Sequence, residues 1–544
     1  HGVCDVPTAG RSPWTAQHFH GKLDRPAILA HAASPDELTA LSKGALPDQR
    51  DVIAYWDTSV GYTDQGIGHL VIDVGPHQLH ATGHNHPVRG QTGWNWSGRH
   101  DSFHTGAHEY GGIEFHADAV IDCKWEGTRT VTVPTDLTSG VYAIRLRIAD
   151  GQGMNEEYVV FFVRAVTPTA KLCFLVPVQS YLAYANEHLS LDAPGIQPMM
   201  GQPPVVADVD LAMHHDPEFG YATYDTYADG GGVSYSSYLR PLFSMRPKFH
   251  MSSNSVPWQF PADLSIIAWL EHSGHDWELI TDEDVHREGV EALRPYRCVM
   301  SGTHPEYCSE QVLDSVEDFL GDGGRFMYMG GNGFYWSVAL DPANPAVMEV
   351  RKLDAGHRSW NARPGEHHMA TTGRKAGLWK QLNRHPQKIF GVGSISEGWE
   401  TGQGYTKMPD AADPAMAWIF HGVPEDVIGD FGLAHGGSAG LEIDRYDLTH
   451  GTPPHTRVVA SSSGHSDNYV VFQDEIFYMQ PGLTGSYDYR IRADMAYYDT
   501  TAGGAMFSTG SIAFGQALPY NHFDNNAARI IDNVVTAFLA EELP

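Results

Sequence analysis

Two short polar segments contain side chains that could carry chemistry, His304-Pro305-Glu306 and Gly330-Gly331-Asn332. An imidazole can transfer a proton, a carboxylate can accept a proton or bind a cation, and an amide can donate a hydrogen bond to a developing negative charge. The first segment begins four residues after the short apolar run at 297–300, and the second directly follows the run at 325–329. If these runs are neighbouring strands of one sheet, the three functional groups converge at one place.

The chain between the two apolar runs has the pattern of a helix. Ser309 can cap its start, residues 321–324 are rich in glycine and can end it, and apolar side chains recur between them at helical spacing: Val312, Leu313, Val316, Phe319 and Leu320. A strand–helix–strand unit predicts parallel pairing of its two strands. Ligands in such sheets bind beyond the carboxyl ends of the strands, which is where both polar segments lie.

Tyrosines form a second group of candidates. Tyr181 and Tyr184 follow a predicted buried strand at 171–178, and Tyr224 lies in a long segment that is rich in Gly, Pro and Tyr. In a parallel sheet, Tyr184 and Glu306 emerge at the same edge. Phenolate and carboxylate oxygens are hard anionic ligands that suit a hard ion such as Fe(III). The simpler interpretation is that the tyrosines pack in the core and their hydroxyl groups find partners there.

Cysteine and histidine offer two other sites. Cys308 lies near His304 and close to the predicted helix start, where a thiol can be activated as a nucleophile; a small packed side chain is the simpler interpretation. The chain has 31 histidines, and His84-Asn85-His86 could bind a metal, although Gly83 and Pro87 favour an ordinary polar loop.

The composition is that of a globular protein with a strong acidic excess. Among 544 residues, 66 acidic and 35 basic side chains give a formal net charge of −31. This argues against nucleic acid as a partner, because phosphates require a cationic face. No apolar run reaches the roughly 20 residues of a membrane-spanning helix, so we expect no membrane partner. Five cysteines without a CxxC pair fit a reducing, cytoplasmic setting.

The patterns predict a multi-domain protein of β and α/β type. Residues 1–50 are irregular and rich in proline, and predict an N-terminal arm. Residues 51–167 predict an antiparallel β-sandwich, with strands at 130–133, 141–148 and 158–163. Residues 168–544 predict a catalytic α/β domain with a parallel sheet, which also contains a helix at 261–274, a strand at 277–281 and a terminal amphipathic helix at 525–543.

Read together, several segments resemble the N,N-dimethylformamidase large (beta) subunit family. The matching pieces occur in the family's order and spacing: SYLAYAN at 180–186, YDTYADGGGVSYSSYLRP at 224–241, THPEY at 303–307, GGRFMYMGGNGFYW at 323–336 and GLW at 377–379. The segment GKLDRPA at 21–27 is similar to the end of that family's N-terminal lectin-like module. The resemblance therefore covers nearly the whole chain.

This resemblance implies a mononuclear iron site with one Fe(III) per chain. By position its ligands are Tyr184, Tyr224 and Glu306, with Tyr221 or Tyr227 as alternatives for the second tyrosine. The family also implies roles near the metal for His304, Asn332, Lys352 and Glu442. It further implies an α/β core of glutamine-amidotransferase-like type, a separate small subunit and self-association of the large subunits.

The implied function is that of an amidohydrolase. It would cleave the C–N bond of N,N-dimethylformamide to formate and dimethylamine, using a water activated by Fe(III). Glu442 or His304 would take the proton of this water, and Asn332 or Lys352 would stabilise the oxyanion. Two alternatives stay open: the same site acting on another small amide, and a non-catalytic carbohydrate-binding protein that stacks sugars on Trp94, Trp96 and Trp125.

Overall fold

A mixed sheet of nine strands forms the centre of the molecule. The computed structural model describes residues 2–3, 15–16, 19–149, 154–192, 199–356 and 358–544. The strand order is β16-β14-β17-β19-β29-β28-β26-β23-β24, with the bounds Trp277–Thr281, Leu172–Val176, Cys298–Ser301, Arg325–Tyr328, Ala505–Ser508, Asp494–Asp499, Arg457–Ser462, Tyr405–Lys407 and Val427–Ile428. The first five strands are parallel, as predicted, and the others pair in antiparallel fashion.

The predicted strand–helix–strand unit is confirmed. Helix α9 (Glu310–Gly321) connects β17 to β19, and the two strands are parallel neighbours. The apolar stripe of α9 is buried against the sheet. Ser309 does occupy the N-cap position, but its hydroxyl lies 2.8 Å from Nδ1 of His286 instead of bonding to the first turn of the helix.

Other elements of the α/β part also follow the predictions. Helix α7 (Phe260–Ser273) has Pro261 in its first turn and ends at Gly274, whose φ of +79° is the left-handed conformation that favours glycine. Helix α11 (Asn526–Leu539) begins at Asn525, whose side chain accepts a hydrogen bond from the Ala528 amide at 2.8 Å. The buried stripe of α11 includes Ile530, Ile531, Val534, Val535 and Phe538. The likeness of this domain to glutamine amidotransferases stays a prediction.

Two smaller sheets are formed by neighbouring parts of the chain. The first has the order β15-β21-β20-β18, with the bounds Tyr235–Ser237, Asn344–Glu349, Trp336–Asp341 and Tyr307–Ser309. The second has the order β25-β22-β27, with the bounds Ala439–Arg445, Gly393–Gln403 and Val470–Val471. Strands β18 and β20 follow β17 and β19 along the chain and are again parallel neighbours. The loops that join these strand pairs therefore run side by side, and they contain both polar segments.

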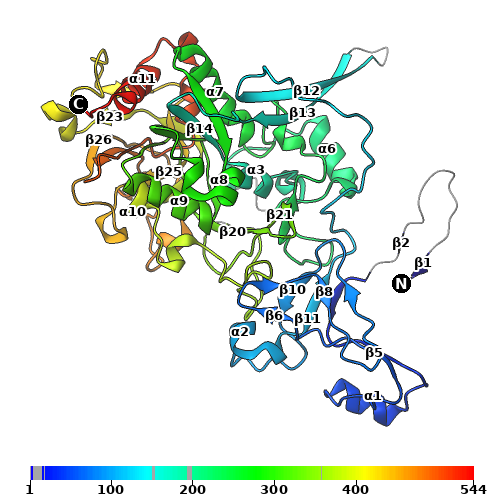
Figure 1. Cartoon of the computed structure of the whole chain (residues 1–544). Helices are drawn as coiled ribbons and strands as arrows, with labels where there is room; N and C mark the ends of the chain where they lie inside the picture. Colours follow the sequence, from blue (N-terminus) through cyan, green and yellow to red (C-terminus); the bar gives the residue numbers. More distant parts are fainter. Residues whose placement is uncertain (1, 4–14, 17–18, 150–153, 193–198, 357) are drawn as a thin grey trace.

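The N-terminal part forms a second body beside the α/β part (Figure 1). It contains short antiparallel strands and two helices: β3 Gly21–Leu23, β4 Ala27–Leu29, α1 Pro35–Ser42, β5 Val52–Tyr55, β6 Tyr62–Thr63, β7 Gly66–Ile67, β8 Leu70–Val71, β9 Ala81–Thr82, β10 Val88–Gln91, α2 Phe103–Gly106 and β11 Gly112–Phe115. The antiparallel character is as predicted. The described sheets have two or three strands each, and their packing as the two layers of a sandwich stays a prediction.

One predicted strand, at 130–133, is wrong. Its two valines are about half exposed, and these residues join no described sheet. An alternating Thr-Val pattern makes a strand only where a neighbouring strand accepts its backbone hydrogen bonds. The next two predicted strands are confirmed as the hairpin of β12 (Gly140–Ala149) and β13 (Met154–Val163), whose predicted turn at 150–151 lies outside the described residues.

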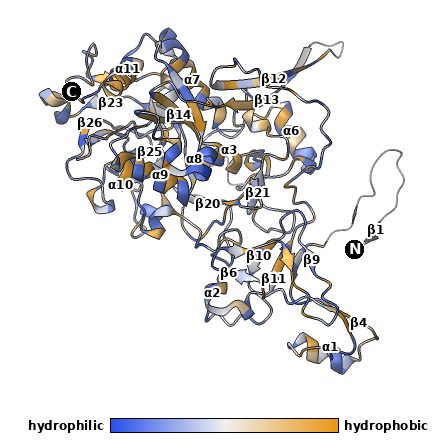
Figure 2. Ribbon diagram, in the orientation of Figure 1, coloured by the Kyte–Doolittle hydropathy of each residue, from blue (hydrophilic) through white to orange (hydrophobic). Residues whose placement is uncertain are grey.

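Hydrophobic residues are concentrated in the strands around β14, as the ribbon colours of Figure 2 show. Every residue of β14 is buried, which is typical of a parallel strand covered on both faces. Of the helices that the structure describes, none has the length and apolar character needed to cross a bilayer.

Candidate active site

Tyr184, Tyr224 and Glu306 meet, although they are far apart in the sequence. The Tyr184 hydroxyl donates to Glu306 Oε2 at 2.7 Å, and the Tyr224 hydroxyl donates to Glu306 Oε1 at 3.1 Å. The two phenol oxygens are 2.8 Å apart, and the rings stack with centroids separated by 4.6 Å. All three side chains are at most 5% exposed. We call these three side chains the oxygen cluster.

The central sheet brings two members of the oxygen cluster together. Tyr184 is the C-cap of α3 (Val178–Ala183), the short helix that follows β14, and Glu306 lies in the segment that follows β17. Because β14 and β17 are parallel neighbours, both residues leave the sheet at the same edge. Ser180 of α3 strengthens this arrangement, since its hydroxyl accepts a hydrogen bond from the Tyr307 amide at 3.0 Å.

The third member comes from the loop that precedes β15. Both the backbone amide and the hydroxyl of Thr223 donate to the Ala183 carbonyl at 3.0 Å, which ties this loop to the end of α3. Tyr221 and Tyr227 instead pack against histidine rings. The structure therefore brings Tyr224 to the oxygen cluster.

Burial sets the charge state of the oxygen cluster. Burial raises the pKa of both Tyr184 and Tyr224 well above the usual range, and the negative charge of Glu306 raises it further. Burial also raises the pKa of Glu306. Three ionised oxygens at this spacing would therefore require a compensating cation. Two phenols and a carboxylate are the donor set that a hard, highly charged cation prefers.

His304 lies between the oxygen cluster and a second carboxylate. Its Nε2 is 3.5 Å from both Glu306 Oε2 and Glu442 Oε2, and its Nδ1 is 2.9 Å from the Gln259 side-chain amide. This Nε2 is therefore within ion-pair distance of both carboxylates. Burial by itself lowers the pKa of His304, but the charges of Glu442 and Glu306 outweigh burial and raise it.

Asn332 holds Glu442 in place. Its Nδ2 donates to Glu442 Oε2 at 2.5 Å, and its Oδ1 accepts from the Ser394 hydroxyl at 2.6 Å. The backbone amide of Asn332 donates to Asp444 Oδ1 at 2.8 Å. The residue has a φ of +51°, a left-handed conformation that asparagine adopts more readily than most residues. The Asn332 amide is thus already engaged in positioning Glu442.

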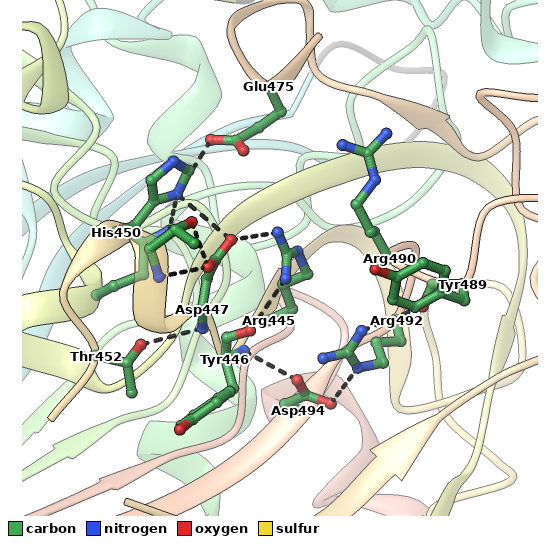
Figure 3. Close-up of polar contacts among 12 residues, drawn as sticks. Arg445, Tyr446, Asp447, His450, Thr452, Glu475, Tyr489, Arg490, Arg492 and Asp494 are labelled. Carbon is green, nitrogen blue, oxygen red and sulfur yellow. Dashed lines mark hydrogen bonds and ion pairs between the residues drawn. The ribbon is translucent and has the colours of Figure 1, made fainter. Parts of the chain in front are cut away.

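Glu442 lies on β25, and polar contacts anchor the carboxyl end of that strand (Figure 3). The Arg445 guanidinium pairs with Asp447, and the Tyr446 amide donates to Asp494 Oδ2 at 2.9 Å. Asp494 belongs to β28 of the central sheet. The position of Glu442 is therefore fixed relative to the same sheet that carries the oxygen cluster.

Lys352 places a buried amino group beside the oxygen cluster. Its Nζ contacts the Tyr307 hydroxyl and lies over three rings, 4.1 Å from the centroid of Tyr224, 4.5 Å from Tyr307 and 4.2 Å from Trp336. Contacts with ring faces stabilise an ammonium group that has lost its hydration. Burial lowers the pKa of Lys352 to about 7.

The structure also brings in residues that were not predicted. Tyr307 directly follows Glu306 in the THPEY segment, so its position in the sequence could have identified it. Gln259 and Ser394 had no such signal, because only tertiary folding brings them to His304 and Asn332.

Cys308 has the surroundings of a structural residue. Its side chain is buried in a hydrophobic cluster with Val312 and Phe334, and burial raises the pKa of its thiol well above the usual range. A nucleophilic cysteine needs a lowered pKa. The structure therefore argues against the cysteine nucleophile.

Comparison with known proteins shows which proteins this chain is similar to. The family model described as N,N-dimethylformamidase beta subunit-like, C-terminal, matches residues 88–526. The chain is 40% identical over 546 aligned residues to the N,N-dimethylformamidase beta subunit of Paracoccus aminophilus, and 41% identical over the same length to that of Alcaligenes sp.. Each alignment covers 99% of this chain and 71% of the relative. The chain thus belongs to the N,N-dimethylformamidase beta subunit family.

Proposed function

We propose that this chain hydrolyses the C–N bond of N,N-dimethylformamide to give formate and dimethylamine. Both relatives described above are named for dimethylformamidase activity. The observation that carries the proposal is the contact of the Tyr184, Tyr224 and Glu306 oxygens at 2.7–3.2 Å, with the imidazole of His304 at 3.5 Å. This arrangement offers both a cation site and a group for proton transfer in one buried place.

In this proposal, the oxygen cluster holds one Fe(III). Its three oxygens can provide three negative charges, which match the charge of the ion, and phenols with a raised pKa ionise readily only next to a cation. When bound, the ion supplies Lewis acidity, which lowers the pKa of water and polarises a carbonyl oxygen.

His304 is the proposed general base and acid. Its Nε2 lies between Glu306 and Glu442, 3.5 Å from an oxygen of each. This nitrogen takes a proton from the attacking water and delivers it to the amide nitrogen, which makes dimethylamine a better leaving group. Glu442, held by Asn332, stabilises the imidazolium between the two steps.

Lys352 is the proposed donor to the oxygen of the substrate carbonyl. Asn332 is less suited to this role, because its amide is bonded to Glu442 and Ser394. The amino group of Lys352 lies in a site shielded from water, where a positive charge stabilises a developing oxyanion most effectively.

The variants Tyr184→Phe and Glu306→Gln test the proposal, since each removes one anionic oxygen and changes the volume little. We expect about one iron per chain in the wild type, with a colour from phenolate-to-iron charge transfer. Both variants should lose the iron and, because they lack it, at least about 100-fold in the rate of dimethylamine release. Elemental analysis and an amine assay measure the two effects.

Tyr181→Phe is the matched control, because the Tyr181 hydroxyl donates to Asp263 and not to the oxygen cluster. It should keep the iron and the activity. Full iron content and full activity in both Tyr184→Phe and Glu306→Gln would show that the proposed site is wrong.

The relatives are named as beta subunits, which supports a partner subunit of the same enzyme. We propose that this chain works together with a separate small subunit, so the assay should use the assembled enzyme. A panel of small formamides and N-alkyl amides, scored by amine release, separates N,N-dimethylformamide from the alternative substrates.

A further inference from the structure

His69, His86 and Asp341 converge at the seam between the N-terminal body and the α/β part. Nε2 of His69 lies 2.9 Å from Asp341 Oδ2, and Nε2 of His86 lies 3.0 Å from the same oxygen. The two imidazole rings are nearly perpendicular, at 81°, with centroids 4.6 Å apart. One ligand atom from each of the three side chains lies within 4.8 Å of the other two.

The three residues lie in separate segments of the chain, two of them with anchored backbones. His69 directly precedes β8, and its carbonyl accepts a hydrogen bond from the Gly83 amide at 2.8 Å. His86 has a φ of +50°, and the preceding Asn85 is anchored through its side chain to the backbone of Ala119 at 2.5 Å. Asp341 ends β20. One polar side chain from each of three separate segments therefore converges at one point.

We propose that His69, His86 and Asp341 bind a divalent transition-metal ion of the zinc class. Two imidazoles and one carboxylate are a ligand set that such ions use when a further position is left for water. Ligand atoms around an ion bound at about 2.0–2.2 Å are separated by roughly 3.0–3.5 Å. The observed separations need to widen by only a few tenths of an ångström.

The surroundings suit an ion that enters from solvent. The side chain of Asp341 is 9% exposed and that of His86 is 13% exposed, whereas that of His69 is 36% exposed. The ion is thus reached from the His69 side, where a water molecule can complete its coordination. The formal net charge of −31 raises the local concentration of cations around the protein.

The site would join the two bodies of the molecule. His69 and His86 belong to the N-terminal body, and Asp341 belongs to β20, which starts at Trp336 beneath Lys352. A small hydrophobic cluster that includes Val88, Tyr235 and Val347 lies at the same seam. A bound ion would link side chains from both bodies, so we expect it to stabilise the folded chain.

Zinc uptake by the full chain tests this inference. Purified protein that keeps its own metals is dialysed against a small excess of zinc, and bound zinc and iron are both measured. The wild type should retain about one zinc per chain more than His69→Ala or His86→Gln. Its midpoint of thermal unfolding should rise with zinc by about 2–4 °C, while those of the two variants stay unchanged.

His84→Ala is the matched control, because His84 is exposed and lies on the same loop as His86. It should take up zinc like the wild type. His69→Ala alters a partly exposed side chain, so it carries the test even if His86→Gln fails to fold. Equal zinc uptake by the wild type and His69→Ala would overturn the proposal and leave the three side chains as a hydrogen-bonded contact only.

Discussion

Lys352 shows how burial among aromatic rings can hold a single residue in an unusual state. Its amino group is fully buried, contacts one hydroxyl and is surrounded by the rings of Tyr224, Tyr307 and Trp336. Burial lowers its pKa to about 7, whereas the charge of Glu306 acts in the opposite direction. A lysine in such a cage can donate a hydrogen bond strongly, because water does not compete with the acceptor.

Replacing this residue tests its role as a donor to the substrate. Lys352→Met keeps the length of the side chain and removes its charge, so we expect a fall in kcat of about 100-fold, the size seen when one oxyanion donor is lost. Steady-state kinetics of amine release measure the effect. The control is Lys375→Met, which alters an exposed lysine and should leave kcat unchanged. A change in KM alone would assign Lys352 to substrate binding instead.

At the level of elements, two consecutive glycines let the loops of the site approach each other. A Cβ on Gly330 would come within 2.2 Å of the Thr303 carbonyl oxygen, and a Cβ on Gly331 would come within 2.3 Å of the Glu442 carbonyl oxygen. Both obstacles are backbone atoms, which cannot rotate away. The loop after β19 can therefore lie against the loop after β17 and against β25 only if it lacks side chains at these positions.

Gly331→Ala should separate the loop that carries Asn332 from strand β25, which carries Glu442. We expect it to lower the stability by about 1–3 kcal/mol, the usual size of overpacking, and to lower kcat. Thermal unfolding and amine release provide the two measurements. In Gly321→Ala the new Cβ meets no atom within 4 Å, so this variant should be neutral or slightly stabilising. Equal stability of the two variants would show that the close approach is unimportant.

The same elements show which features of the site a sequence can reveal. The βαβ unit was predictable because a helical stripe lies between two apolar runs. The parallel sheet that it indicates also includes β14, and the pairing of β14 with β17 brings Tyr184 and Glu306 to one edge. Gln259 was not predictable, since no local pattern links it to His304. The strand at 130–133 was predicted wrongly because local alternation does not report whether a pairing partner exists.

At the scale of the whole molecule, ion pairs join parts that are distant in the sequence. Arg164, directly after β13, forms two hydrogen bonds of 2.7 Å to Glu288 at the end of α8 (Asp282–Glu288). The hydrogen bonds from Arg164 are the main reason that the pKa of Glu288 falls from 4.5 to about 2. The pair thereby fastens the β12–β13 hairpin to the α/β part.

This pair predicts a specific dependence of stability on pH. Because the pKa of Glu288 is lowered by folding, its contribution is complete above about pH 4.5 and is lost as the pH falls towards 2. Both side chains are about one third exposed, so solvent screening limits the contribution to about 1 kcal/mol. Arg164→Ala should lower the unfolding midpoint by about 1–2 °C at pH 7 and by less at pH 3. A difference that stays constant with pH would contradict this assignment.

The enclosure of the oxygen cluster also bears on how iron and substrate reach it. Its three donor groups come from distant stretches of the chain and are almost completely shielded from solvent. A ferric ion of the kind proposed above would reach these donors only when the surrounding shell opens, and the same opening would have to admit each substrate molecule. Iron uptake by the finished protein and turnover of substrate would then depend on one and the same motion.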